Sequence, residues 1–164
     1  MTGLGTQPTP AEISDFASVD YHPSRTEDDV PANTILRMDD LPWVGWIDPR
    51  TGEKNTTVLS KSLLPDSKNH SAAIVWTEPG FTSSPHWHPS DTLYVVLSGE
   101  WHIEGEGTYR PGEYRWVPGG TAYGVESTGS EHAQILLISF GPGGRFDADK
   151  VPAPNGDVRK RVKE

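Results

Sequence analysis

An antiparallel all-β fold is the architecture that this sequence predicts, and three observations favour it. The 164 residues include 17 glycines and 15 prolines, so turn-forming residues interrupt most windows long enough for a helix. From Thr34 onward, short runs of β-prone residues alternate with turn signals at intervals of roughly eight to twelve residues, the pattern of sandwiches and barrels. The connections are too short for crossover helices, so neighbouring strands should be antiparallel.

The strands expected in the first half of this region are runs of β-branched, aromatic and aliphatic residues. They end at breaks rich in proline, glycine and asparagine, at residues 48–52, 65–69 and 78–80. The runs are Thr34–Met38, Trp43–Ile47, Thr56–Ser62 and Ala72–Glu78.

The strands expected in the second half are shorter and more closely spaced. Their breaks are marked by glycine or by proline followed by glycine, as at residues 98–99, 105–107, 111–112, 118–120 and 141–144. The runs are Thr92–Leu97, Glu100–Glu104, Gly107–Arg110, Glu113–Val117, Tyr123–Ser127 and His132–Ser139.

Two flanking segments differ in composition from the barrel region at residues 34–142. Residues 1–33 contain four prolines, an acidic group and few large apolar residues, which indicates an extended N-terminal arm. The residues about Pro10–Ala17 carry the start signals of a short helix, with Thr9 as its cap, but the segment is too short for a helix to be stable alone. Residues 143–164 are expected to form a loosely packed C-terminal tail.

Composition and charge exclude several classes of function. The formal net charge of −9 disfavours nucleic acid as a partner, because an anionic surface repels the phosphate backbone. Apolar runs such as Ile135–Ile138 are far shorter than the ~20 residues of a membrane span, so no membrane is expected and the predicted location is cytoplasmic. Cysteine is absent, which leaves His, Asp, Glu and Tyr as the side chains able to hold a metal.

The most informative motif is His86-Trp87-His88, between Gly80 and Gly99. Residues two apart on a strand point to the same face, so both imidazoles can converge on one ion. Taken alone, the motif is weak evidence for a metal site, and two unrelated histidines are the commoner interpretation.

The surrounding residues resemble the two motifs of the cupin superfamily. Gly80, His86, His88 and Gly99 fit the first motif, while Gly112, Pro118 and Gly120 fit the second. The resemblance implies a cupin-type antiparallel β-barrel, or jelly roll, and loosely favours the cupins that cleave diketones and dihydroxyacetophenones. It also implies a divalent metal ion inside the barrel, with Fe(II) as the first choice and Zn, Mn or Ni as alternatives.

Two of the four usual metal ligands of the family are replaced in this chain. Thr92 stands at the glutamate position and Tyr123 at the third histidine position. With His86 and His88 as ligands, Asp91 is the candidate that would complete a site of two histidines and one carboxylate. Water or substrate could fill the remaining positions, and Tyr123 could either bind the metal or act on the substrate.

Three further residues are expected to line the cavity and contact a small organic substrate: Thr92, Tyr94 and Trp76. Core packing is the alternative reading for Trp76 and Tyr94. His102 and His132 are interpreted as a surface or interface residue and a strand-end residue, respectively.

Three classes of function follow from this sequence, because cupin folds host many chemistries. The first is a metal-dependent enzyme of the oxygenase type that uses the two-histidine site. The second is a lyase, isomerase or cyclase in which Tyr123 and a histidine perform acid–base chemistry. The third is a non-catalytic ligand-binding barrel. A homodimer is expected in each case, since an exposed sheet edge and an arm favour pairing between protomers.

Overall fold

The computed structural model describes residues 8, 13–17, 37–47, 51–64 and 69–160. The described elements are nearly all strands, with two short 3-10 helices. In chain order they are β1 (Ile13–Ala17), η2 (Met38–Asp40), β2 (Trp43–Ile47), β3 (Lys54–Ser62), β4 (Ser71–Thr77), β5 (His86–Trp87), β6 (Thr92–Ser98), β7 (Trp101–Ile103), β8 (Gly107–Tyr109), β9 (Tyr114–Val117), β10 (Glu126–Thr128), β11 (Ala133–Ser139), β12 (Phe146–Asp147) and η3 (Val158–Lys160).

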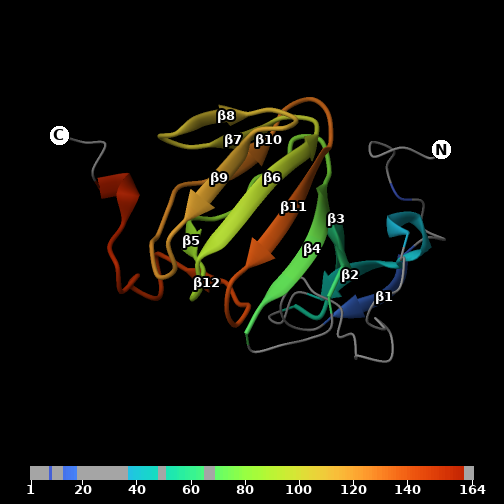
Figure 1. Ribbon diagram of the computed structural model, residues 1–164, viewed down its shortest axis with the longest axis horizontal. Helices are drawn as coiled ribbons and strands as arrows, with labels where there is room; N and C mark the ends of the chain where they lie inside the picture. Colours follow the sequence, from blue (N-terminus) through green and yellow to red (C-terminus); the bar gives the residue numbers. More distant parts are fainter. Residues whose placement is uncertain (1–7, 9–12, 18–36, 48–50, 65–68, 161–164) are drawn as a thin grey trace.

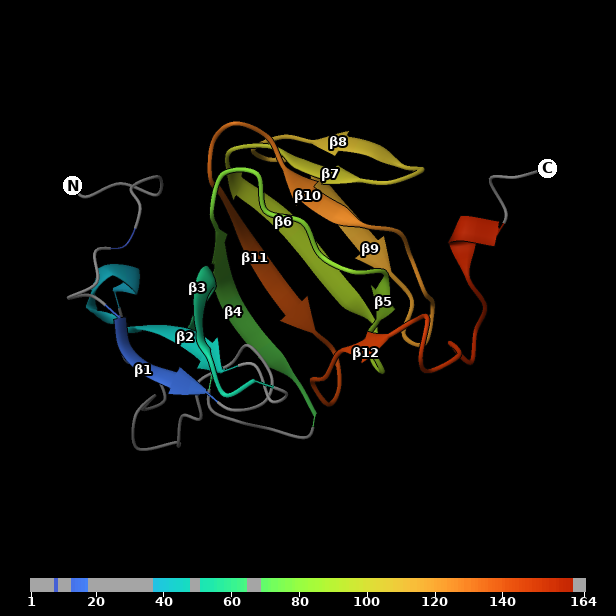
Figure 2. The same cartoon turned by 180° about the vertical axis from the view of Figure 1, so that it is seen from behind.

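These strands form three sheets that together make the expected jelly roll. The largest sheet has the order β1-β2-β3-β4-β11-β6-β9, and smaller sheets have the orders β10-β7-β8 and β12-β5. Figure 1 shows the large sheet running diagonally, with β7, β8 and β10 at its upper end. Figure 2 shows the opposite side, where β5 and β12 lie. Every pairing is antiparallel except that of β1 with β2, which is parallel.

The interior of the barrel is built by the alternation of side chains along β6 and β11. Tyr94 and Val96 of β6 and Ile135 of β11 point inward and pack with Trp101 and Ile103 of β7. A second core cluster, on the other face of the large sheet, contains Trp43, Leu59, Ile74 and Trp76. The inner cluster surrounds the candidate site described below.

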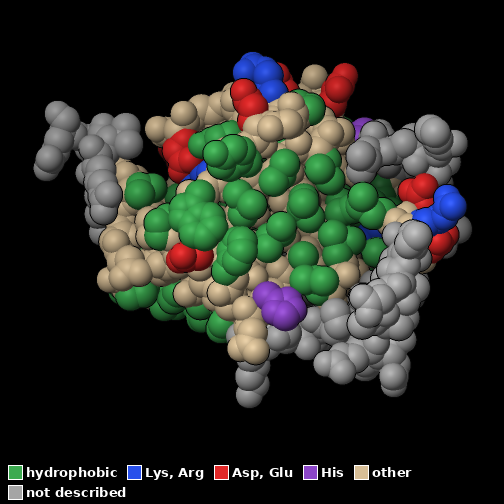
Figure 3. Space-filling view, viewed as in Figure 1, with side chains coloured by type: hydrophobic (Ala, Val, Ile, Leu, Met, Phe, Trp, Pro, Cys, Tyr) green, Lys and Arg blue, Asp and Glu red, His purple; other side chains and the backbone are tan. Residues whose placement is uncertain are grey.

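The outer face of the large sheet is apolar as well. Figure 3 shows hydrophobic side chains covering the sheet around β9, β6 and β11. Tyr114 is 69% exposed, and Trp116 and Phe140 are 49% and 56% exposed. The rings of Trp116 and Phe140 contact each other, with centroids 5.4 Å apart. Edge strand β9 therefore presents large aromatic side chains to solvent.

Two sequence-based expectations for the flanking segments are wrong. Residues 13–17 form strand β1 and not part of a helix at Pro10–Ala17, because pairing with β2 provides hydrogen bonds that so short a helix cannot match. The C-terminal segment is not loosely packed: β12 pairs with β5, and the Trp87 indole nitrogen donates a hydrogen bond to the Val151 carbonyl oxygen at 2.9 Å.

At Met38 the structure shows a 3-10 helix where the expected strand Thr34–Met38 would end, and residues 34–36 of that strand lie outside the described part of the chain. Among the described residues, no helix is long or apolar enough to cross a membrane.

Candidate functional site

A cavity opens between the inner face of the large sheet and strands β5, β7 and β10. Its empty volume is about 720 Å³, counting the open mouth. The polar and charged side chains that line it are Thr77, Ser83, His86, His88, Tyr94, Glu126, Ser139 and Arg145. Its apolar walls are Val58, Val75, Phe81, Trp101, Ile135 and Leu137.

His86 and His88 both face this cavity, as their spacing predicts. Their rings lie 5.2 Å apart, nearly perpendicular. The Nδ1 atom of His86 lies 2.8 Å from the Ser84 carbonyl oxygen, and Nδ1 of His88 lies 2.6 Å from that of Gly144. Each carbonyl accepts a hydrogen bond from Nδ1–H, which fixes the orientation of its ring.

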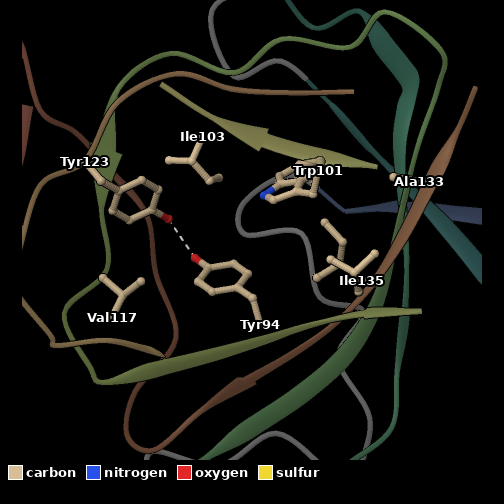
Figure 4. Close-up of a cluster of buried hydrophobic side chains, with 8 residues drawn as sticks. Tyr94, Trp101, Ile103, Val117, Tyr123, Ala133 and Ile135 are labelled. Carbon is tan, nitrogen blue, oxygen red and sulfur yellow. Dashed lines mark hydrogen bonds between the residues drawn. The ribbon is translucent and has the colours of Figure 1, made fainter. Parts of the chain in front are cut away.

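A chain of hydrogen bonds continues from His86 through two tyrosines. The Tyr123 hydroxyl lies 2.8 Å from Nε2 of His86 and 2.7 Å from the Tyr94 hydroxyl. Figure 4 shows the two hydroxyls pointing toward each other from opposite walls of the barrel. Tyr123 faces His86 because the two residues form an isolated antiparallel bridge, which places their side chains on the same side. With Nδ1 of His86 protonated, Nε2 accepts a hydrogen bond from the Tyr123 hydroxyl.

Arg115 packs behind the tyrosines and is neutralised by a carboxylate. It lies opposite Tyr94 in the pairing of β6 with β9. Its guanidinium sits 4.1 Å from the centroid of the Tyr123 ring and forms a bidentate ion pair with Glu106. Arg115 thus holds the Tyr123 ring in place through contacts on the side away from the cavity.

Burial sets the protonation of these groups. Burial and the nearby charge of Arg145 hold the pKa of His86 well below 6.5, so its imidazole is neutral at pH 7. Burial also raises the pKa of Tyr94 and of Tyr123 above 10, so both keep their protons. None of these three groups changes its charge near neutral pH.

Glu126 is a buried group of the cavity whose pKa lies near neutrality. Its side chain is buried, and its Oε2 atom lies 3.6 Å from Nε2 of His86. Burial raises its pKa to about 7, against partial compensation by the charges of Arg115 and Arg145. Its other carboxyl oxygen, Oε1, has no hydrogen-bond partner among the described residues.

The predicted metal site is only partly assembled. Asp91 is exposed and does not join the two histidines; its Oδ1 accepts a hydrogen bond from the Gly119 amide at 2.8 Å. Within residues 13–17, 37–47, 51–64 and 69–160, no group of three or more His, Asp and Glu side chains is placed to hold a metal. The described residues therefore do not fit the two-histidine, one-carboxylate centre that the sequence suggests.

Of the three residues predicted to contact the substrate, only Tyr94 lines the cavity. Tyr94 lines the cavity as expected. Thr92 does not line the cavity as expected: it is fully buried, and its hydroxyl donates a hydrogen bond to the Ser90 carbonyl oxygen at 3.0 Å. The expectation that Trp76 faces the cavity is wrong: it packs in the second core cluster, because it alternates along β4 with the cavity-lining Val75 and Thr77.

Tyr123 is itself fully buried and touches the site through His86 and Tyr94. Two further histidines that the sequence analysis considers, His102 and His132, lie outside the cavity. His102 is exposed on the β7–β8 hairpin, where its Nδ1 lies 3.1 Å from the Thr108 hydroxyl. His132 stacks on Trp76 with ring centroids 6.0 Å apart.

Sequence reasoning missed Glu126 and Arg145. The strand expected at Tyr123–Ser127 begins only at Glu126, so an alternating pattern counted from Tyr123 assigns Glu126 to the wrong face. Arg145 comes from the segment before β12, which returns over the mouth of the cavity through the pairing of β12 with β5. The signal for Glu126 that the sequence did offer was a glutamate inside the run expected to form the strand Tyr123–Ser127.

Comparison with known proteins agrees with this architecture. Residues 73–139 match the family described as Cupin domain. A solved sugar phosphate isomerase of the cupin superfamily from Silicibacter pomeroyi is similar over 71% of this chain and 82% of its own, at 20% identity and a TM-score of 0.57.

Two further solved structures are similar. For an acetylacetone dioxygenase from Acinetobacter johnsonii the coverage is 72% and 80%, the identity 17% and the TM-score 0.55. KdgF from Halomonas is similar over 65% of this chain and 94% of its own, at 21% identity and a TM-score of 0.50. No curated protein sequence matches the chain significantly. At these identities the structures establish the fold, and the chemistry has to be argued from the cavity.

Proposed function

Because residues 73–139 match the Cupin domain family, whose fold hosts many chemistries, we propose the reaction from the cavity itself. The proposed activity is that of an acid–base enzyme, of the lyase, isomerase or cyclase type, that acts on a small organic substrate. One observation carries the proposal. Glu126 faces the cavity with a carboxyl oxygen that has no partner among the described residues, and its pKa of about 7 suits proton transfer at neutral pH.

Glu126 is the proposed general base and acid. In its ionised form it accepts a proton from a carbon next to a substrate carbonyl; the C–H bond breaks and its electron pair moves onto the carbonyl oxygen as an enolate. In its protonated form it returns the proton, to the same carbon or to another one. Val58, Val75, Ile135 and Leu137 give this exchange an apolar surrounding, and the open mouth lets the proton on Glu126 exchange with solvent.

Tyr123 acts in this proposal as a positioning residue. Its hydroxyl donates a hydrogen bond to Nε2 of His86, which favours the neutral imidazole and orients it beside Glu126. The prediction of Tyr123 as a catalytic residue is thereby refined to a supporting role.

The experiment is hydrogen–deuterium exchange on a panel of enolisable carbonyl compounds. Incubation with 2-oxobutanoate, dihydroxyacetone or cyclohexanone in D₂O, followed by proton NMR, should show exchange at the α-carbon faster than in buffer. Glu126→Gln should slow it by about 100-fold or more, the usual contribution of a general base. Glu131→Gln removes an exposed carboxylate and is the matched control. Full exchange activity in the Glu126→Gln protein would refute the proposal.

A metal-dependent oxygenase of the dioxygenase type is the second candidate. The supporting observation is that Nδ1 of each histidine is held by a backbone carbonyl, as is usual for imidazole ligands of metals. With two imidazoles as protein ligands, water or substrate would have to complete the coordination of Fe(II), Zn, Mn or Ni.

Elemental analysis of untagged protein separates the two candidates. Stoichiometric metal that is lost in His86→Ala and His88→Ala, together with metal-dependent oxygen consumption, would favour the oxygenase. Exchange that depends on Glu126 and survives chelation would favour acid–base chemistry.

A further inference from the structure

Arg145 is the one guanidinium among the described residues that lines the cavity. It is half-buried and follows Gly144, whose carbonyl oxygen accepts the hydrogen bond from His88. The other guanidinium nearby, that of Arg115, is occupied by Glu106 on the far side of the tyrosines. The charge of Arg145 therefore acts on the cavity itself.

The contacts of Arg145 hold it in place without neutralising it. Its Nη2 atom donates hydrogen bonds to the carbonyl and hydroxyl oxygens of Ser84, each at 3.0 Å, and lies 3.3 Å from Nδ1 of His86. No carboxylate of the described chain lies within ion-pair distance of it, whereas Arg110, Arg115 and Arg159 all have such a partner. Within the described part of the chain these hydrogen bonds involve only Nη2, so Nη1 and Nε can serve a ligand.

We propose that the cavity binds a small monoanion with an apolar body, such as a carboxylate, and that Arg145 selects for its negative charge. This inference rests on the proposed function, in that it names the class of substrate on which Glu126 would act. A planar guanidinium matches a carboxylate in bidentate geometry, and the match is strongest where water is displaced.

The rest of the lining sets the body of the ligand and limits its charge. Phe81, Trp101, Ile135 and Leu137 offer a surface suited to a hydrocarbon or aryl group. Glu126, when ionised, repels a second negative charge, and a dianion such as a phosphate monoester would face a single guanidinium. A neutral ligand would bury Arg145 without a counter-charge, which is unfavourable. A monoanion satisfies both constraints.

Matched pairs of carboxylate and amide test this inference by direct binding, independently of turnover. Titration calorimetry with phenylacetate against phenylacetamide, and with hexanoate against hexanamide, should show at least about tenfold tighter binding of each carboxylate to the wild-type protein. Arg145→Gln should bring each pair to within about twofold, chiefly by weakening the carboxylate. Arg145→Lys keeps the charge without the bidentate geometry and should retain part of the preference.

Control variants separate charge selection from general damage. Arg110→Gln removes an exposed guanidinium paired with Glu100 and should keep the full preference. A carboxylate preference that is missing in the wild type, or unchanged in a folded Arg145→Gln protein, would overturn the inference. So would phenyl phosphate binding more tightly than phenylacetate.

Glu126→Gln keeps the two proposals distinguishable. It removes proton exchange if the proposed function is right, but leaves the carboxylate preference of Arg145 intact or stronger. Preference without exchange would refute the acid–base function alone, and exchange without preference would refute the role of Arg145 alone.

Discussion

Replacing Glu126 with glutamine should change how the stability of the protein depends on pH. The pKa of Glu126 is raised from 4.5 to about 7 by burial, so the folded protein holds this proton over a pH range in which the unfolded chain has lost it. Stability therefore falls as the pH rises from about 4.5 to about 7. A shift of about 2.5 units corresponds to about 3 kcal/mol, at ~1.36 kcal/mol per unit.

The neutral amide of Glu126→Gln does not carry this penalty. Relative to the wild type, the variant should gain about 3 kcal/mol of unfolding free energy between pH 4.5 and pH 8.5. His86 acts in the opposite sense: its pKa lies below 6.5, so stability is lost as the pH falls below that value. Because both proteins contain His86, its contribution largely cancels in the difference between them.

The assay is urea unfolding at a series of pH values, followed by tryptophan fluorescence. Glu131→Gln, at an exposed position, gives the effect of removing one negative charge from a chain of net charge −9. Parallel stability curves for the wild type and Glu126→Gln would show that Glu126 ionises normally in the folded state. The argument that burial prepares it for proton transfer would then fail.

Three further outcomes are expected. Tyr123→Phe should reduce proton exchange by about tenfold while the fold is retained, because His86 loses the hydrogen bond to Nε2; unchanged rates would contradict the positioning role. The protein should be a homodimer that uses the apolar outer face around β9, so light scattering should give twice the chain mass of 18.0 kDa. Trp116→Glu should halve that mass, and a monomeric wild type would contradict the prediction. Gly99→Ala should destabilise the protein by more than about 2 kcal/mol in thermal unfolding, because its φ is positive and a Cβ there would lie 2.2 Å from a backbone oxygen. Gly112 also has a positive φ but has open space around it, so Gly112→Ala should cost only about 1 kcal/mol. Equal losses of stability in the two variants would argue against the clash.

Local sequence pattern was sufficient for most of the strands, because side-chain alternation and turn residues act over a few positions. Trp43–Ile47 was predicted with its observed bounds, and β6 and β11 differ from the prediction by one residue. Strand β1 escaped prediction since its pairing partner, β2, lies beyond a long intervening segment. The resemblance to cupins correctly implied the barrel, through glycines and prolines that fix turns.

Some residues of the candidate site follow from the local sequence, and others enter it through contacts between distant segments. The convergence of His86 and His88 follows from their spacing alone, since residues two apart on a strand share a face. Glu126 enters the cavity because its strand begins late, and Arg145 because pairing between β12 and β5 brings the C-terminal segment back over the mouth. The sequence by itself determined the fold class and the two histidines, whereas the tertiary structure decided which charged groups surround them. Those groups act through burial and proximity, and both depend on contacts between residues far apart in the chain.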